Sequence, residues 1–468
     1  MKVIPYGGAQ TVTGSCFYVQ VRDVNLLIDC GMFQGRLEEK NRQPFPFDPR
    51  SINYLVLTHA HIDHCGRIPL LVKEGFRGKV ICTEPTAKLA KLMLLDASKV
   101  MYENYKTALK KLQRKGRLPE PPLYEEYDVL EAMELFKVRL SYGEKYRLSK
   151  GISLRLKDAG HILGSSFVEL EVFEDKRQKR VVFSGDLGNK NKPIIRDPDT
   201  PLPADYVFVE STYGDRNHKS FEQSKEELLQ AIQYAVGRGG NVVIPSYALE
   251  RAQEILYVLR EFYEEGRLPK CEIFLDSPLA ISITRLFTSH PEFYDRETYR
   301  VFLEKNPFEL PNLHYTKEPE ESKAINSITS GAIIIAGSGM LNGGRVLHHL
   351  KYNLWREECA LIFVGYQPEG TLGRRIIEGA ESVRIFGDDI SVKAKVFTIN
   401  GFSSHADQKG LIEWLSYARK PQKVFLVHGE EEKMKLFGEA IQNELNLSWS
   451  IPEEGRLLSF NLTGLRLL

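Results

Sequence analysis

Short apolar runs separated by glycine-containing turns dominate the first hundred residues. Their length and their bounding turn residues are typical of strands. A helical stretch is expected after Pro85. The strands that this pattern predicts are residues 2–6, 15–21, 26–28, 54–58 and 79–83.

Strands return between residues 153 and 186. Here Val168, Leu170 and Val172 alternate with Glu169 and Glu171. Such alternation predicts a strand with one buried and one solvent-facing side. The first two hundred residues are therefore expected to form sheet-rich layers covered by helices.

From Asp205 the pattern changes to alternating strands and helices, which is typical of a parallel α/β domain. The last stretch repeats it, with strands at 393–399 and 423–427, each followed by a helix. No internal repeat or low-complexity linker separates this stretch from the rest. The strands and helices expected between them are 206–209, 225–236, 242–244, 248–264, 272–275 and 333–335.

Composition limits the class of protein. A chain of 468 residues, 42% hydrophobic and 27% charged, predicts two or three folded units and argues against a disordered protein. A net charge of +1 neither indicates nor excludes a nucleic-acid partner. The six cysteines form no CxxC pair, no secretory h-region opens the chain, and no apolar run reaches membrane-spanning length. We therefore expect reduced thiols, a cytoplasmic location and no membrane partner.

The strongest chemical signal lies where the strand at 54–58 ends. The next residues, His59-Ala60-His61-Ile62-Asp63-His64, place four potential metal ligands on one loop. Imidazole and carboxylate groups suit zinc, and the spacing lets His59 and His61 face one ion while Asp63 and His64 face another. Solvated loop histidines are the alternative, but three of the chain's 11 histidines fall within these six positions.

Two later strand ends supply further ligands. His161 closes Asp158-Ala159-Gly160-His161, and Asp186 closes Phe183-Ser184-Gly185-Asp186. Asp186 is a natural bridging carboxylate for a two-metal site.

These residues resemble, in order, the HxHxDH loop, later His and later Asp of the metallo-β-lactamase superfamily. Asp29 also matches an early Asp of that superfamily, which orients a ligand or a loop. Taken alone, Asp29 could equally be a turn residue. The resemblance covers the first two hundred residues.

The rest of the chain resembles the β-CASP group of RNA-processing nucleases within that superfamily. Three ordered segments carry the resemblance: 209–214 (Val-Glu-Ser-Thr-Tyr-Gly), 402–407 (Phe-Ser-Ser-His-Ala-Asp) and 426–430 (Leu-Val-His-Gly-Glu). The implied fold is an α/β protein, a metallo-β-lactamase αββα sandwich with an inserted parallel α/β β-CASP domain. The implied domains are the first part of the sandwich at 1–205, the insert at 206–392 and the completing part at 393–468.

The resemblance also implies the ligand set and its chemistry. Two Zn²⁺ ions per chain, or Mn²⁺ in their place, could activate a water and neutralise charge during in-line displacement at phosphorus. His405, supported by Glu210, is the implied proton donor or phosphate contact, and Asp63 is counted with them as catalytic. The products would carry 5′-phosphate and 3′-hydroxyl ends. One ion is assigned to His59, His61, His161 and Asp186, and the other to Asp63, His64, Asp186 and His428.

Two glycine-containing turns are candidates for binding substrate phosphate. The first, 337–345, supplies Ser338, Gly339, Gly343 and Arg345, and the second, 370–375, supplies Thr371 and Arg374. Tight turns or ordinary helix starts are the alternatives. A basic run, favoured as a solvated helix face, comprises Lys106, Lys110, Lys111, Arg114, Lys115 and Arg117.

The sequence therefore predicts a zinc-dependent ribonuclease acting on RNA, single-stranded RNA being favoured. Endonuclease is preferred, because no RNase J-type C-terminal extension is recognised. The alternatives are a 5′-to-3′ exoribonuclease, a DNA nuclease, a thioester or lactone hydrolase, and a non-catalytic RNA-binding scaffold. A homodimer is left open. Histidines assigned structural or surface roles are His218, His290, His314, His348 and His349.

Overall fold

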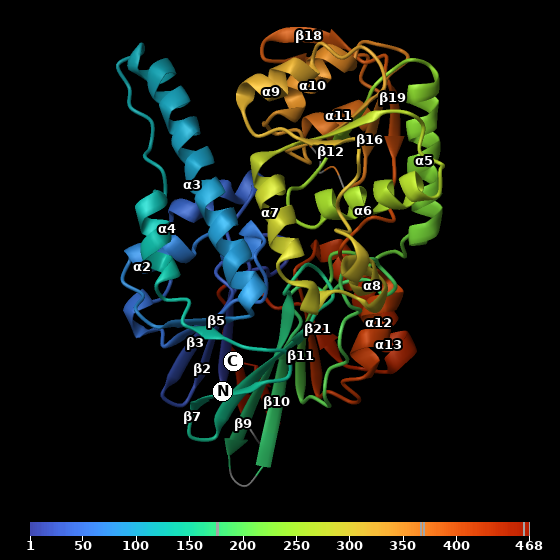
Figure 1. The fold of residues 1–468 in the computed structure, drawn as a ribbon. Coiled ribbons are helices and arrows are strands. Elements are labelled where there is room, and N and C mark those ends of the chain that lie inside the picture. The colour runs from blue at the N-terminus through green and yellow to red at the C-terminus, as the bar shows by residue number, and fades with distance from the viewer. Residues whose placement is uncertain (175–176, 366, 368–369, 462–463, 468) are drawn as a thin grey trace. The chain divides into compact units, whose positions relative to one another are not determined.

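The computed structural model describes residues 1–174, 177–365, 367, 370–461 and 464–467. The chain divides into two compact units (Figure 1). Unit 1 comprises Met1–Lys190, Asp197–Asn217 and His405–Leu468, and unit 2 comprises Asn191–Arg196 and His218–Ser404.

Unit 1 contains two mixed sheets. The first has the order β23-β22-β1-β2-β3-β4-β5-β6 and the second β21-β20-β11-β10-β9-β8-β7. The strands of the first are Lys2–Gly7 (β1), Cys16–Val21 (β2), Val24–Ile28 (β3), Tyr54–Val56 (β4), Lys79–Cys82 (β5), Val138–Arg139 (β6), Leu458–Asn461 (β22) and Gly464–Leu467 (β23). Those of the second are Lys145–Ser149 (β7), Ile152–Asp158 (β8), Ser166–Glu174 (β9), Arg177–Phe183 (β10), Tyr206–Glu210 (β11), Lys423–Val427 (β20) and Trp449–Ser450 (β21).

One apolar core joins the two sheets. Phe17 of β2 contacts Phe183 and Phe208 of the second sheet, with ring centroids 6.0 and 5.9 Å apart. A second core covers the other face of β9, β10, β11 and β20, where Phe167 meets Trp414 edge-on at 5.3 Å. Helices therefore pack outside the two facing sheets, which confirms the predicted αββα sandwich (Figure 1). The helices of unit 1 are Gly35–Arg42 (η1), Pro49–Ser51 (η2), Ile62–Cys65 (α1), Ile68–Lys73 (α2), Glu84–Gln113 (α3), Glu126–Met133 (α4), Gln408–Ser416 (α12) and Glu431–Leu445 (α13).

The prediction of a half-buried strand in β9 was wrong. Glu169 is 0% exposed and Glu171 is 4% exposed. Glu169 accepts a hydrogen bond from the Leu202 amide at 2.8 Å, and Glu171 accepts from Arg155 and Lys145, both at 2.7 Å. The polar side of the strand is buried because basic side chains and a returning segment cover it.

Unit 2 is built around a six-stranded sheet in which every pairing is parallel, as predicted. Its order is β14-β13-β15-β12-β16-β19. The strands are Val242–Pro245 (β12), Glu272–Asp276 (β13), Leu313–Tyr315 (β14), Ala332–Ala336 (β15), Ala360–Phe363 (β16) and Lys395–Thr398 (β19), with a separate hairpin of Ser382–Ile385 (β17) and Asp388–Ser391 (β18). The helices are Phe221–Gly237 (α5), Arg251–Glu264 (α6), Pro278–Thr288 (α7), Pro291–Phe293 (η3), Arg296–Glu304 (α8), Pro319–Ile325 (α9), Val346–Asn353 (α10) and Leu372–Ile377 (α11).

The limits of the two units differ from the domain boundaries expected at 206 and 393. Strand β11 pairs with β10 and β20, so residues 206–217 lie in unit 1. Strand β19 pairs with β16, so residues 393–404 lie in unit 2. Pairing partners distant in sequence decide both boundaries.

All six cysteines are buried free thiols. Among the described helices, none combines the length and the apolar character that crossing a membrane requires.

Candidate metal centre

The first four candidate ligands lie where β4 gives way to the short helix α1. His61 is the residue before that helix, so Asp63 and His64 lie within its single turn. The Ser15 amide donates to Asp63 O at 2.9 Å and the Cys30 amide to His64 O at 2.9 Å. Gly31 permits this close approach, because a Cβ there would lie 1.6 Å from Asp63 O. Backbone contacts from β2 and from the end of β3 therefore fix the ligand loop.

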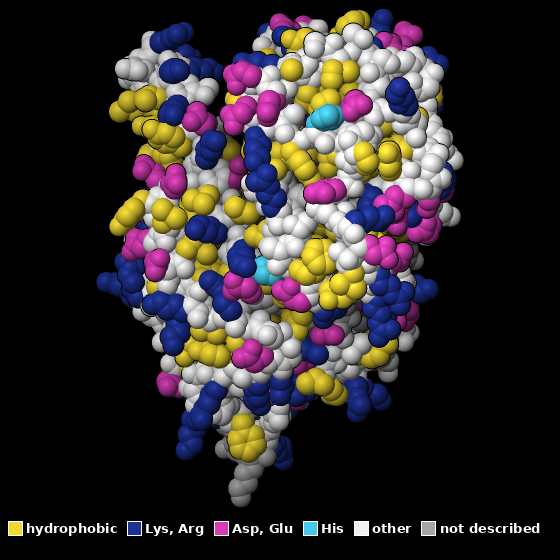
Figure 2. Space-filling view, in the orientation of Figure 1, with side chains coloured by type: hydrophobic (Ala, Val, Ile, Leu, Met, Phe, Trp, Pro, Cys, Tyr) yellow, Lys and Arg dark blue, Asp and Glu magenta, His cyan; other side chains and the backbone are white. Residues whose placement is uncertain are grey.

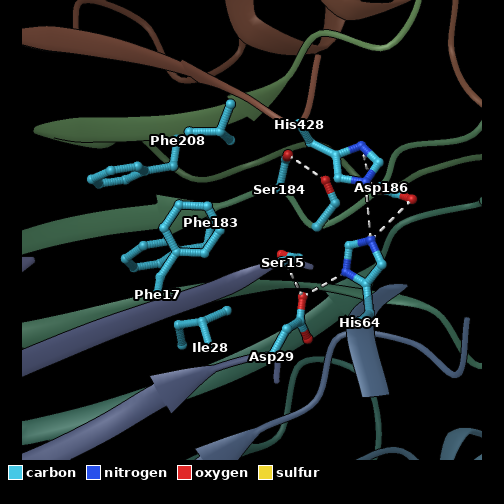
Figure 3. Close-up of a pocket in the computed structure, with 12 residues that line it drawn as sticks. Ser15, Phe17, Ile28, Asp29, His64, Phe183, Ser184, Asp186, Phe208 and His428 are labelled. Atoms are coloured by element: carbon cyan, nitrogen blue, oxygen red, sulfur yellow. Dashed lines mark hydrogen bonds and ion pairs between the residues drawn. The ribbon is translucent and has the colours of Figure 1, made fainter. Parts of the chain in front are cut away.

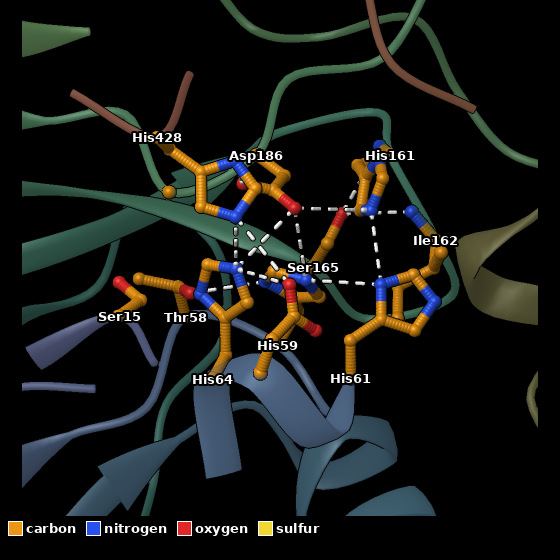
Figure 4. A network of polar contacts seen from close by, with 12 residues as sticks. Ser15, Thr58, His59, His61, His64, His161, Ile162, Ser165, Asp186 and His428 are labelled. Carbon is orange, nitrogen blue, oxygen red and sulfur yellow. Dashed lines mark hydrogen bonds and ion pairs between the residues drawn. The ribbon is translucent and has the colours of Figure 1, made fainter. Parts of the chain in front are cut away.

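The remaining candidates come from three other strand ends. Asp186 follows β10, and His428 follows β20 with a φ of 49°. The loop carrying His161 is held by Ser165, whose hydroxyl accepts from the His161 amide at 3.1 Å. Gly188 lies so close to this loop that a Cβ would be 1.6 Å from Gly160 O. Four strand ends thus converge on one side of unit 1 (Figure 4).

The first group that could hold a metal consists of His59, His61, His161 and Asp186. His61 Nδ1 lies 3.2 Å from both His59 Nε2 and His161 Nε2. Asp186 Oδ2 lies 3.4 Å from His59 Nε2 and 3.6 Å from His161 Nε2.

The second group consists of Asp63, His64, Asp186 and His428. His64 Nε2 lies 3.3 Å from His428 Nε2 and 3.3 Å from Asp186 Oδ2. Asp63 Oδ2 lies 3.4 Å from His428 Nε2 and 3.7 Å from His64 Nε2. Asp186 is shared by the two groups, so the structure brings together all seven side chains expected as ligands.

These separations fit zinc. A tetrahedral ion with bonds of about 2.0–2.1 Å holds its ligand atoms roughly 3.3–3.4 Å apart. Asp186 Oδ1 is buried and has no hydrogen-bond partner among the described residues, although His428 Nδ1 lies 3.3 Å away. A buried carboxylate oxygen without a hydrogen-bond donor fits a group that binds cations.

Burial also prepares the histidines of the first group to act as ligands. It lowers the pKa of His59 to about 3 and that of His61 to about 4, and it holds the pKa of His161 well below its usual value. Neutral imidazole is the form that binds a metal. Burial raises the pKa of Asp186, but the neighbouring imidazoles outweigh it and hold this pKa well below the ordinary range.

Asp29 connects the two ligand groups from beneath. Its Oδ2 lies 2.7 Å from His64 Nδ1 and accepts the Thr58 hydroxyl at 2.9 Å, while its Oδ1 accepts the Thr58 amide at 2.8 Å. The Thr58 hydroxyl also lies 3.0 Å from His59 Nδ1. Asp29 therefore orients a ligand in each group, the role expected from the resemblance. Its φ of 61° shows that the position is also a strained turn.

Glu210 and His405 form a pair beside the shared ligand. Both carboxylate oxygens of Glu210 lie 3.2 Å from His405 Nδ1, and Asp186 Oδ2 lies 3.9 Å from the same nitrogen. Burial lowers the pKa of His405, but the charges of Glu210 and Asp186 raise it to about 9. The imidazole is therefore protonated at neutral pH. Because Asp186, Glu210 and His405 also form a group of possible ligands, a cation there is the alternative to a proton.

A small cavity lies beneath the second ligand group (Figure 3). His64, Ser184 and Asp186 line its polar end, and Phe17 and Phe208 line its apolar end. The aromatic core between the sheets thus extends to the second ligand group.

The turns expected to bind phosphate both lie in unit 2, where internal contacts engage several of their side chains. The Arg345 guanidinium donates to Asp276 at 2.7 Å and to two carbonyl groups. Ser338 Oγ accepts from the Asn342 amide at 3.0 Å and donates to Gly343 O at 3.2 Å.

The second turn is an ordinary helix start in its geometry. Thr371 caps α11 by accepting from the Arg374 amide at 3.2 Å, and the Arg374 side chain pairs with Glu378 at 2.6 Å. Gly339 lies against the Tyr247 ring, whereas a Cβ at Gly343 would meet open space.

Sequence reasoning missed three residues that position the centre. Thr58 is one, and Thr212 Oγ1, 3.1 Å from His428 Nδ1, is another. The Asn189 side chain donates to His405 O at 2.6 Å and accepts from the Asp407 amide at 3.1 Å, so it fixes the loop that carries His405. The sequence offered a signal for the first two, because Thr58 directly precedes His59 and Thr212 lies in the segment 209–214. Nothing in the sequence marks Asn189.

Three family models match the chain. The metallo-beta-lactamase superfamily matches residues 10–139, the Beta-Casp domain residues 252–376, and the Zn-dependent metallo-hydrolase RNA specificity domain residues 389–452. The cluster of His and Asp side chains and these family models together fit a metal cofactor.

Curated proteins resemble the chain over nearly its full length. Ribonuclease TTHA0252 of Thermus thermophilus is 42% identical over 94% of this chain and 96% of its own length. An RNase J-like protein of Methanocaldococcus jannaschii is 31% identical over 97% of this chain and 98% of its own length. Transcription termination factor FttA of the same organism is 32% identical over 97% of this chain and 70% of its own length.

A solved structure from Enterococcus faecalis, described as a protein of unknown function, shares the fold with a TM-score of 0.54. It is 13% identical and covers 97% of this chain and 99% of its own. With 42% identity to a relative across almost all of both chains, and with matches to both characteristic domains, this chain belongs to the β-CASP family of the metallo-β-lactamase superfamily of hydrolases.

Proposed function

We propose that this chain is a ribonuclease that hydrolyses internal phosphodiester bonds of RNA, using two zinc ions. The observation that carries the proposal is the pair of ligand groups that share Asp186. When bound, two zinc ions would supply an activated water and neutralise the charge that develops on the phosphate.

The chain's own residues would hold that chemistry in place. Asp186 contributes to both ligand groups, and Asp29 orients His64 directly and His59 through Thr58. Ligands fixed in this way hold their orientation when substrate binds.

His405 is the proposed proton donor. Glu210 engages its Nδ1, and we assign to the other ring nitrogen, Nε2, the proton that is donated toward a phosphate oxygen or the leaving oxygen. With a pKa raised to about 9, this proton is present at neutral pH. Glu210, which is 0% exposed, holds the ring and balances its charge.

RNA is the proposed substrate because of the family and the relatives. One relative is named a ribonuclease and another an RNase J-like protein, and an RNA specificity domain model matches the segment that contains both His405 and His428. In unit 2, the candidates for holding RNA phosphates remain Ser338, Gly339, Gly343, Arg345, Thr371 and Arg374.

The test uses one sequence as linear RNA, circular RNA and DNA. Zinc-loaded wild-type protein is incubated with each, beside His405→Ala and a matched control, His314→Ala. His314 is a half-exposed histidine of unit 2 that pairs with Glu272 at 2.7 Å. Zinc content is measured for all three proteins.

We expect wild type and His314→Ala to open the circular RNA and to leave 5′-phosphate and 3′-hydroxyl ends. We expect His405→Ala to keep its zinc and to lose about 10²- to 10⁴-fold in rate. If the protein cuts linear RNA but not circular RNA, it is an exonuclease and does not cleave internal bonds. Zinc-loaded protein that cuts no RNA would refute the proposal, and cleavage of DNA alone would reassign the substrate.

A further inference from the structure

Helix α3 has two halves with different surroundings. Its buried residues extend from Pro85 to Ser98, and none follows between Lys99 and the end of the helix at Gln113. The second half therefore projects from the body of unit 1, and the chain returns alongside it toward α4 (Figure 1). We call residues 99–120 the arm.

Helix α3, whose second half forms the arm, begins beside the loop that carries His161. At the start of α3, the hydroxyls of Thr83 and Thr86 both donate to Gly164 O, at 2.7 and 2.8 Å. Gly164 belongs to the loop that carries His161. A helix of 30 residues is about 45 Å long, and Lys99 lies about 23 Å along it. The arm is thus the far part of one continuous helix whose first turn lies beside the loop of a candidate ligand.

The arm carries far more positive than negative charge. Its two acidic side chains already have partners: Glu103 pairs with Lys106 at 3.1 Å, and Glu120 pairs with Arg42 at 2.6 Å. Figure 2 shows Lys and Arg side chains gathered at the end of this projection. The cationic residues, all exposed, are Lys99, Lys106, Lys110, Lys111, Arg114, Lys115 and Arg117.

Three of the charges follow one face of the helix. Lys106, Lys110 and Arg114 recur every four residues, so they follow one another along one face at intervals of about 6 Å. Tyr105 and Leu112 lie on the opposite face and are partly covered. A helix end with one partly covered apolar face and a row of exposed cations along another face suits an elongated anion better than a single ion.

We propose that the arm binds the phosphate backbone of single-stranded RNA and guides the strand toward the metal centre. This inference rests on the proposed function for the choice of RNA as the polyanion. Contacts of this kind are sequence-independent and strongly dependent on salt. The arm therefore affects how tightly long RNA is held and not the bond-breaking step.

The test neutralises the end of the arm with Lys110→Gln, Lys111→Gln, Arg114→Gln and Lys115→Gln together. Glutamine keeps the helix propensity of the lysine and arginine that it replaces. The control makes the same number of changes at exposed lysines elsewhere in unit 1: Lys2→Gln, Lys79→Gln, Lys137→Gln and Lys150→Gln. Both variants have the same net charge, and circular dichroism checks that both are folded.

Binding is measured by fluorescence anisotropy with RNA of 5 and 30 nucleotides at several salt concentrations. Five stacked nucleotides span about 17 Å, which is shorter than the distance from the start of α3 to Lys99. We expect the arm variant to bind the 30-mer at least about tenfold more weakly at low salt, with a salt slope reduced by up to about 3. Cleavage of the 5-mer should match wild type.

Equal affinity and equal salt slope in the arm variant and wild type would overturn the inference. So would an equal loss in the control variant, because net charge alone would then explain the effect. Wild-type protein that cuts neither RNA but binds the 30-mer through the arm would refute the proposed nuclease while leaving the arm as an RNA-binding surface.

Discussion

Asp29 shows how one side chain outside the ligand set can control the centre. It touches His64 and Thr58, and through Thr58 it reaches His59. Removing its charge therefore affects both ligand groups, whereas loss of any ligand other than Asp186 affects one group directly.

We expect Asp29→Asn to weaken zinc binding by about 10- to 100-fold, the usual cost of removing a hydrogen-bond partner of a metal ligand. Competition with a chromogenic chelator measures it. Asp23→Asn, a change at an exposed carboxylate in the same region of sequence, is the control. Wild-type affinity in Asp29→Asn would show that His64 and His59 hold their orientation without it.

Glu210→Gln tests the charge on His405. Glu210 is a main cause of the raised pKa, about 9, so the proton is present below pH 9 and is lost above it. We expect the cleavage rate of wild type to fall as pH rises past about 9. In Glu210→Gln we expect this fall at a lower pH, together with a reduced kcat. A pH–rate profile measures this, with Glu222→Gln on the exposed start of α5 as the control. An unshifted pH–rate profile would show that Glu210 does not set the pKa of His405.

At the scale of elements, the sequence predicted where strands end better than it predicted which faces of the strands are buried. The candidate ligands follow β4, β8, β10 and β20, the strand ends at which they were expected, because polar residues after short apolar runs mark strand ends. The burial of Glu169 and Glu171 was not predictable, since their partners come from other strands and from the segment near Leu202. Alternation shows that a strand has two faces, but it does not show what covers each face.

Glu171 of strand β9 should make the free energy of unfolding depend on pH in the acidic range. Burial raises the pKa of Glu171, but Arg180, Lys145 and Arg155 outweigh it and lower this pKa to about 2. The contribution of the carboxylate is complete above its ordinary pKa of 4.5 and is lost as pH falls toward 2. We expect Glu171→Gln to lower the free energy of unfolding by about 1–3 kcal/mol at pH 7.

Urea unfolding of metal-free protein between pH 3 and 7 measures this effect. The difference between Glu171→Gln and wild type should be constant above about pH 5 and should shrink below it. Glu134→Gln, at an exposed carboxylate after α4, should show no such difference. A difference that persists unchanged at pH 3 would mean that the glutamate acts through packing instead of charge.

At the scale of the molecule, the chain passes four times between the two units. The alternation of strands and helices predicted the parallel sheet of unit 2, but it could not assign β11 and β19 to their sheets. Strands β11 and β19 both contain short apolar runs in sequence, and only the strands they pair with, β10 and β16, show to which sheet each belongs.

Removal of metal should separate the responses of the two units. All proposed ligands belong to unit 1, and a bound ion at a thousand times its Kd stabilises its unit by about 4 kcal/mol. We expect chelation to speed amide hydrogen exchange around residues 59–64 and 426–430 and to leave β12 and β15 unchanged. Exchange read by mass spectrometry, with zinc added back as the control, measures this. Equal loss of protection in β12 would show that the two units respond together.

The order of these side chains along the polypeptide matters during translation. His405 and His428 follow unit 2, whereas Asp186 and Glu210 precede most of it. Protein synthesis proceeds from the N-terminus, and earlier segments fold while later ones are still being made. A ribosome must therefore synthesise unit 2 before the second ligand group and the His405–Glu210 pair can form. The messenger being translated, and the ribosome itself, are not exposed to a finished nuclease until His405 and His428 have been added.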